Sequence, residues 1–183
     1  GLHKSAIENV LWSSWGSGSA CLEVSGDDVM LLSAATFSIV APSIKDFATG
    51  GSYAYIALVP QTAPSVILGA NTIVEVGTTY TIQEPLMTLN WTDVDFHVFV
   101  NAQDRLLRMF TLRVDLELPV AIAPDGQGNL IPVIGDIETA IQNVRTLRTE
   151  LLAEDPQRIS DLVPTLVGTA APQLLNALPE SIA

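Results

Sequence analysis

The sequence is poor in charged residues and poorest in basic ones. Only 15% of its 183 residues are charged, against 48% that are hydrophobic, and 8 basic residues face 20 acidic ones, which gives a formal net charge of -12. Binding to nucleic acid depends on Lys and Arg, so this composition argues against a nucleic-acid partner. It also disfavours adhesion to anionic membranes. No run approaches about eighteen uncharged apolar residues, so the sequence predicts no transmembrane segment.

Cysteine is almost absent, because Cys21 stands alone. A single cysteine forms no internal disulfide, so cysteine usage does not indicate whether the protein works in an oxidising or a reducing compartment. Its neighbours Ala20 and Leu22 predict a small buried hydrophobe at this position. A chain of this length fits one domain and can bury a sizeable core.

Recognisable catalytic and cofactor-binding motifs are missing as well. We find no nucleophile elbow, phosphate-binding loop or zinc-ligand spacing, and therefore expect no enzymatic activity, no cofactor and no metal. Asp93, Asp95 and His97 fall on one face of a predicted strand, where two carboxylates and an imidazole would suit a metal or proton transfer. No second cluster completes such a site, so we expect a solvated strand face there.

The sequence is rich in a two-residue alternation of polar and apolar side chains between residues 93 and 122. Successive side chains of a strand point to opposite faces, so this pattern predicts one long antiparallel hairpin with one apolar and one wet face. Residues 101–104 have the composition of its turn. The predicted apolar face carries Val94, Phe96, Val98, Val100, Leu106, Phe110, Leu112, Val114, Leu116, Leu118, Val120 and Ile122. So long an apolar face needs a long element laid on it, or a ligand.

Helical spacing marks both ends of the chain. Residues 2–15 predict an amphipathic helix. Asp155 followed by Pro156 predicts the start of a second helix, whose broad apolar face runs from Ile159 to Leu178. Between them we expect a strand over residues 35–40, a short helix over residues 41–47, and strands over residues 53–59, 65–68, 72–76 and 79–82. Residues 130–151 fit both a helix and a strand, and their spacing alone does not separate the two.

Four segments in this order resemble the bactericidal/permeability-increasing protein and lipopolysaccharide-binding protein family, of the tubular lipid-binding (TULIP) superfamily. They are the helix-to-strand junction at residues 12–24, the segment 37–44, the hairpin segments 94–100 and 106–110, and residues 161–167 with the apolar stretch after them. The resemblance is to the C-terminal half of the family's proteins and spans nearly the whole chain. It implies an α+β fold over residues 1–183, in which a long, highly twisted antiparallel sheet wraps around amphipathic N- and C-terminal helices. It also implies that residues 130–151 are mostly strand.

The resemblance further implies non-enzymatic binding or transfer of a lipid or other hydrophobic ligand in an apolar tunnel between sheet and helices. The candidate tunnel-lining residues are Ile7, Leu11, Trp15, Phe110, Leu112, Val114, Leu116, Val163, Leu166, Val167 and Leu174. An alternative is a structural or interaction module with a filled cavity. The acidic charge departs from the basic surface of the family's immune members, and one module stands where they carry two. We therefore expect another module or subunit as partner. The abrupt start at Gly1 has a fragment of a longer chain as one of its interpretations. The resemblance also implies a secreted, periplasmic or cell-surface location.

Overall fold

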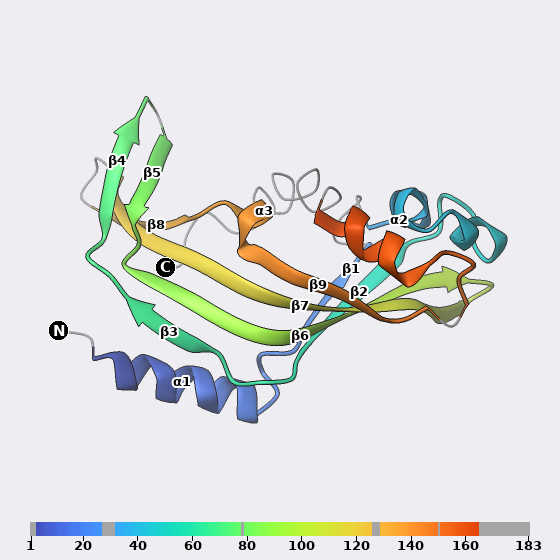
Figure 1. The fold of residues 1–183 in the computed structure, drawn as a ribbon, viewed down its shortest axis with the longest axis horizontal. Helices are drawn as coiled ribbons and strands as arrows, with labels where there is room; N and C mark the ends of the chain where they lie inside the picture. The colour runs from blue at the N-terminus through green and yellow to red at the C-terminus, as the bar shows by residue number, and fades with distance from the viewer. Residues whose placement is uncertain (1–2, 27–31, 78, 126–128, 150, 165–183) are drawn as a thin grey trace.

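The protein is an α+β fold in which a curled antiparallel sheet carries its N-terminal helix on the outer side and the other helices on the concave side (Figure 1). The computed structural model describes residues 3–26, 32–77, 79–125, 129–149 and 151–164. Within these residues, no helix has both the length and the apolar character needed to span a membrane. The elements are α1 (Lys4–Gly16), β1 (Leu22–Ser25), α2 (Ala34–Val40), the 3-10 helix η1 (Pro42–Asp46), β2 (Ala54–Pro60), β3 (Ser65–Leu68), β4 (Thr72–Val76), β5 (Thr79–Glu84), β6 (Met87–Ala102), β7 (Arg105–Pro124), β8 (Leu130–Ile134), α3 (Ile137–Ala140) and β9 (Ile141–Arg148).

Strands β6 and β7 form the long hairpin that the alternating sequence predicts, and every other strand of the main sheet attaches to it directly or through β2. The first half of β6 pairs with β3 and its second half with β2, which in turn pairs with the edge strand β1. Likewise β7 pairs first with β9 and then with β8. Residues 130–148 are therefore mostly strand, as the resemblance implied, with the short α3 between β8 and β9.

A bulge in β7 changes which side chains face the core. Val98 pairs with Phe110 and Phe99 with Arg108, so Met109 is an extra residue, and Met109 and Phe110 are 0% and 1% exposed. Such a bulge shifts the alternation by one. The prediction that Leu106 lies on the apolar face is therefore wrong. Leu106 is 50% exposed, and its neighbour Leu107 packs against the core instead.

The predicted strand over residues 35–40 is also wrong, because α2 occupies this segment. The Ser33 hydroxyl accepts a hydrogen bond from the Thr36 N–H at 3.3 Å, which is an N-cap contact that starts a helix. Ala34, Phe37 and Ser38 are buried at the three- and four-residue spacing of one helix face. The continuous apolar run of this segment hides that spacing from the sequence pattern.

The core lies between the helices and the half of the sheet nearest the β6–β7 turn. Its buried members are Leu32, Ala34, Phe37, Val40, Ala41, Ile44, Ala54, Val98, Val100, Met109, Phe110, Leu112, Ile159 and Val163. They come from α2, η1, the sheet and the helix over residues 156–164. Helix α1 lies apart from this core and packs along β3, as Figure 1 shows. The prediction of a buried thiol is wrong too, since Cys21 is exposed just before β1.

Candidate functional site

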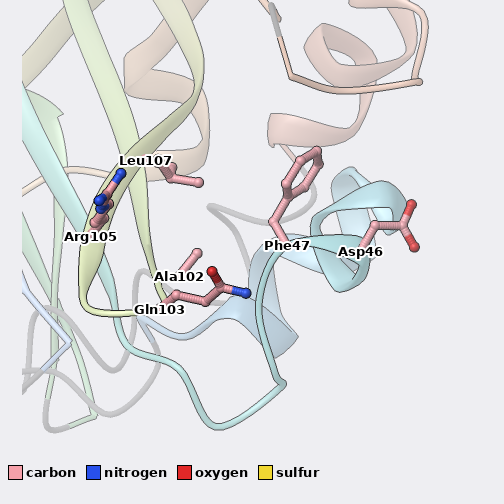
Figure 2. Close-up of a pocket in the computed structure, with 6 residues that line it drawn as sticks. All are labelled: Asp46, Phe47, Ala102, Gln103, Arg105 and Leu107. Atoms are coloured by element: carbon pink, nitrogen blue, oxygen red, sulfur yellow. The ribbon is translucent and has the colours of Figure 1, made fainter.

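A pocket of about 450 Å³ opens at one end of the core, between the end of η1 and the turn that joins β6 to β7 (Figure 2). It is lined by Asp46, Phe47, Ala102, Gln103, Arg105 and Leu107. Its volume falls in the range of about 300–1,000 Å³ that is typical of small-molecule sites.

One wall of the pocket is positioned by η1 and its attachment to the loop before the last helix. Pro42 occupies the first turn of η1, where a missing N–H costs nothing. Glu154 accepts hydrogen bonds from the Ser43 N–H at 2.7 Å and from the Ser43 hydroxyl. This carboxylate holds the start of η1 against the loop, and so fixes where Asp46 and Phe47 lie.

The other wall is positioned by the tight turn of the hairpin. Gln103 and Asp104 have φ values of 51° and 62°. Two consecutive left-handed residues are the geometry of a type I′ turn, whose twist matches that of the flanking strands. The turn brings Ala102, Gln103 and Arg105 to the end of the sheet beside η1.

The floor of this pocket is apolar and its rim is polar. Phe47 and Leu107 are half-buried and pack against the core, and Ala102 is 6% exposed, so the floor is continuous with the core. Gln103 extends its amide from the turn toward the η1 segment, while Asp46 and Arg105 lie at opposite sides (Figure 2). These groups can bury an apolar group and hydrogen-bond a polar one. The six lining residues include no nucleophile paired with a base.

A second cavity, of about 440 Å³, is lined by Asp115, Asn143, Val144 and Arg145. Asp115 accepts hydrogen bonds from the Asp93 N–H at 2.9 Å and from the Asn143 amide at 2.7 Å. These two bonds, the backbone one first, lower the pKa of Asp115 below its ordinary value. The carboxylate oxygens of Asp115 are thus already used by groups within the chain, and we assign this cavity no ligand.

The polar strand face around His97 is paired, not solvated. Asp95 is 7% exposed and accepts two hydrogen bonds from Arg113, at 2.6 and 2.9 Å. His97 Nδ1 lies 3.0 Å from the Thr111 hydroxyl, and burial is the main cause that lowers the pKa of His97. Among the described residues, no group of three or more His, Cys, Asp or Glu is placed to hold a metal ion.

The candidate tunnel residues fall in different places. Phe110, Leu112 and Val163 lie together in the core, with the Phe110 ring 6.1 Å from that of Phe37. Val114 is buried as well, whereas four others are half-buried, namely Leu116, Ile7, Leu11 and Trp15. The Trp15 indole N–H donates a hydrogen bond to the Pro60 carbonyl at 3.1 Å. Leu166, Val167 and Leu174 lie outside the described residues. None of the candidates lines the pocket beside η1.

Sequence reasoning missed all six residues of that pocket. It recognised the short helix over residues 41–47 and the turn over residues 101–104 separately, but nothing in either pattern indicates that they meet. The one usable signal was Leu107, an apolar residue beside Leu106 that breaks the alternation and so marks a bulge.

Comparison with known proteins finds a match among solved structures. No protein-family model and no curated protein matches the sequence. A crystal structure of lipopolysaccharide binding protein is similar to this chain with a TM-score of 0.46 and 12% sequence identity. The match covers 87% of this chain and 33% of that protein, so the chain spans about a third of its length.

Proposed function

We propose that this chain binds a lipid or another hydrophobic ligand and performs no chemistry on it. The observation that carries the proposal is the pocket beside η1, whose apolar floor is continuous with the core and whose rim offers an amide and two opposite charges. Burial of each CH₂ group contributes about 0.8 kcal/mol, so a short acyl segment binds there without an ion pair. The sequence resemblance to lipid-binding proteins supports the same proposal, together with a secreted, periplasmic or cell-surface location.

The test is a binding titration with a fluorescent fatty acid whose emission rises in an apolar site. We expect saturable binding by the wild-type chain. Leu107→Ala removes part of the floor and should weaken binding by about tenfold, because about two CH₂ equivalents of contact are lost.

Leu106→Ala is the matched control, because it removes the same side chain one residue away on the opposite face of β7. It should leave the affinity unchanged. Thermal melts of both variants establish that each is folded. Equal affinities of the two variants, or no saturable binding by the wild type, would contradict a ligand site at this pocket.

An interaction module is the second candidate, and exposed apolar side chains favour it. Ile67 on β3 is 62% exposed, Val76 on β4 is 58% exposed and Leu130 on β8 is 71% exposed. Side chains of this kind favour association with another module or subunit. Light scattering at low and physiological salt separates the candidates, because a net charge of -12 opposes self-association chiefly at low salt. A monomer under both conditions would remove the self-association form of this candidate.

A further inference from the structure

The outer face of the sheet, opposite the core, carries rows of side chains that the strand register aligns. His97 on β6 pairs with Thr111 on β7, and Thr111 pairs with Arg148 on β9. Arg108 lies in the neighbouring row, opposite Phe99. Val98 points into the core, so His97 and Phe99 point outward, and directly paired residues share a face.

This face carries half of the basic residues of the chain, together with the carboxylates of Asp95, Asp115 and Glu117. Of the 8 basic residues, the outer rows of β7 and β9 hold Arg108, Arg113, Arg145 and Arg148. Arg113 is bound by Asp95 in two hydrogen bonds, and Arg145 contacts Asp93 at 2.8 Å, so the row of Arg113 is charge-balanced. The row of His97 holds Arg148, and Arg108 lies in the row next to it.

The strand register places both arginines beside the His97–Thr111 pair, with Arg148 across Thr111 in the same row and Arg108 in the next row of β7. After burial, and against the opposing effect of Asp95, the positive charges of Arg108 and Arg148 contribute to lowering the pKa of His97. Three nitrogen-bearing side chains from three strands therefore converge on one part of the outer face. Arg148 is exposed there, while His97 and Arg108 are half-buried.

We propose that Arg108, Arg148 and His97 form a binding site for a phosphate-type oxyanion, either free or as the headgroup of a lipid. A planar guanidinium presents paired N–H donors that match the oxygens of a phosphate. Both arginines also interact within the chain. Each guanidinium has five N–H donors, so the site requires only that some of them reach the ligand. His97 supplies a further ring nitrogen, because its Nδ1 is the one that meets Thr111.

The overall negative charge does not prevent such binding at physiological salt. Screening limits the reach of exposed charges to about 8 Å at 0.15 M ionic strength, so the arginines beside the ligand dominate. This site is separate from the pocket beside η1, and its failure leaves the proposed function intact.

The test uses the two histidines of the chain, His97 and His3, as reporter and internal control. Inorganic phosphate is titrated into the protein at constant ionic strength while the imidazole resonances are followed by NMR. We expect saturable shifts at His97 and none at His3. Arg148→Gln should weaken phosphate binding by about tenfold, because a charge-assisted contact is lost. Arg158→Gln removes an equal charge from the helix over residues 156–164 and should leave binding unchanged.

Flotation with phosphatidylcholine vesicles, with and without phosphatidic acid, distinguishes the two sources of the oxyanion. Saturable binding of inorganic phosphate supports a site for the free ion. Binding only to vesicles that contain phosphatidic acid, lost in Arg148→Gln and kept in Arg158→Gln, supports a headgroup site. No binding in either assay, or an equal loss in both variants, overturns the proposal.

Discussion

The carboxylate of Glu154 offers the sharpest test of how the pocket wall is held. It accepts hydrogen bonds from the Ser43 N–H at 2.7 Å and from the Ser43 hydroxyl, which itself accepts one from the Ala153 N–H at 3.2 Å. Truncation by Glu154→Ala removes both acceptors and leaves the η1 donors without their partner. We expect the free energy of unfolding to fall.

The size of this effect follows from the contacts. A hydrogen bond to a charged group contributes about 1.5–3 kcal/mol, and the lower end applies because Glu154 is only half-buried. Glu154→Ala should therefore cost about 2–3 kcal/mol and Ser43→Ala about 1–1.5 kcal/mol. In a chain of this length, about 1 kcal/mol corresponds to about 2–4 °C in Tm. The two variants share a contact, so their effects should be non-additive by about 1 kcal/mol.

The contribution of Glu154 should also depend on pH. Burial acts to raise the pKa of Glu154. Hydrogen bonds from the Ser43 side chain and backbone outweigh burial, and the backbone N–H of Glu154 and the charge of Arg158 act in the same direction as these bonds. The pKa of Glu154 therefore lies below the ordinary value of 4.5. The folded pKa is thus the lower one. The stabilisation is fully present above the unfolded pKa and is lost as the pH falls through the folded pKa.

Urea unfolding followed by tryptophan fluorescence, at pH 7 and at acid pH, measures both effects. Glu8→Ala serves as control, because the Glu8 carboxylate meets Lys4 at 3.3 Å in an exposed pair on α1. Such a pair should contribute less than about 0.5 kcal/mol. The reasoning is refuted if the Ser43 and Glu154 variants are additive, or if the cost of Glu154→Ala is the same at both pH values.

Three further predictions test the register, the core and the hairpin of β4 and β5, which pair with each other in a two-stranded sheet apart from the main one. Leu107→Lys should cost at least about 2 kcal/mol in urea unfolding, because it brings a charge against the core, while Leu106→Lys should cost less than about 0.5 kcal/mol; similar costs would contradict the bulge at Met109. Phe110→Ala should cost about 3–5 kcal/mol, since the ring is fully buried against Phe37, and a cost below about 1 kcal/mol would contradict that packing. Asn71→Ala should speed hydrogen exchange of the β4–β5 amides, because the Asn71 side-chain amide makes two hydrogen bonds to the Ile122 backbone, at 2.9 and 3.0 Å. Unchanged exchange would show that other contacts attach the β4–β5 hairpin to β7.

The long hairpin was predictable because a period of two sustained from residue 93 to residue 122 matches paired strands and does not fit the 3.6-residue period of a helix. Its two irregularities were not predictable. Asp93 has a φ of 54° and donates its N–H to Asp115, which forms one bulge, and Met109 forms the other. Each bulge depends on a cross-strand partner, and neither has a local sequence signal strong enough to compete with the alternation.

The elements with local start signals were also predictable. Asp155 caps the last helix as expected, accepting from the Gln157 N–H at 2.7 Å, and Pro42 opens η1. Helix α2 has such a signal in Ser33, but its apolar run resembles a buried strand, and only packing against the sheet separates the two.

The candidate site was not predictable, because it forms where η1 meets the β6–β7 turn. Phe47 and Leu107 are ordinary apolar residues in the sequence, and their role as a pocket floor depends on which of their faces the core leaves uncovered. Sequence patterns indicate which face of an element is apolar. They do not indicate where two elements stop short of each other.

The sharing of β6 and β7 among four neighbouring strands has a consequence for how the chain reaches its fold. The two central strands are joined by only Gln103 and Asp104, so their pairing closes the shortest loop of the main sheet. Pairings with little sequence separation form fastest. During synthesis, β6 and β7 are complete before β8 and β9 have been made, while β2 and β3 have already emerged. The hairpin can therefore serve as a template to which the earlier strands attach along β6, leaving the matching edge of β7 for those that follow.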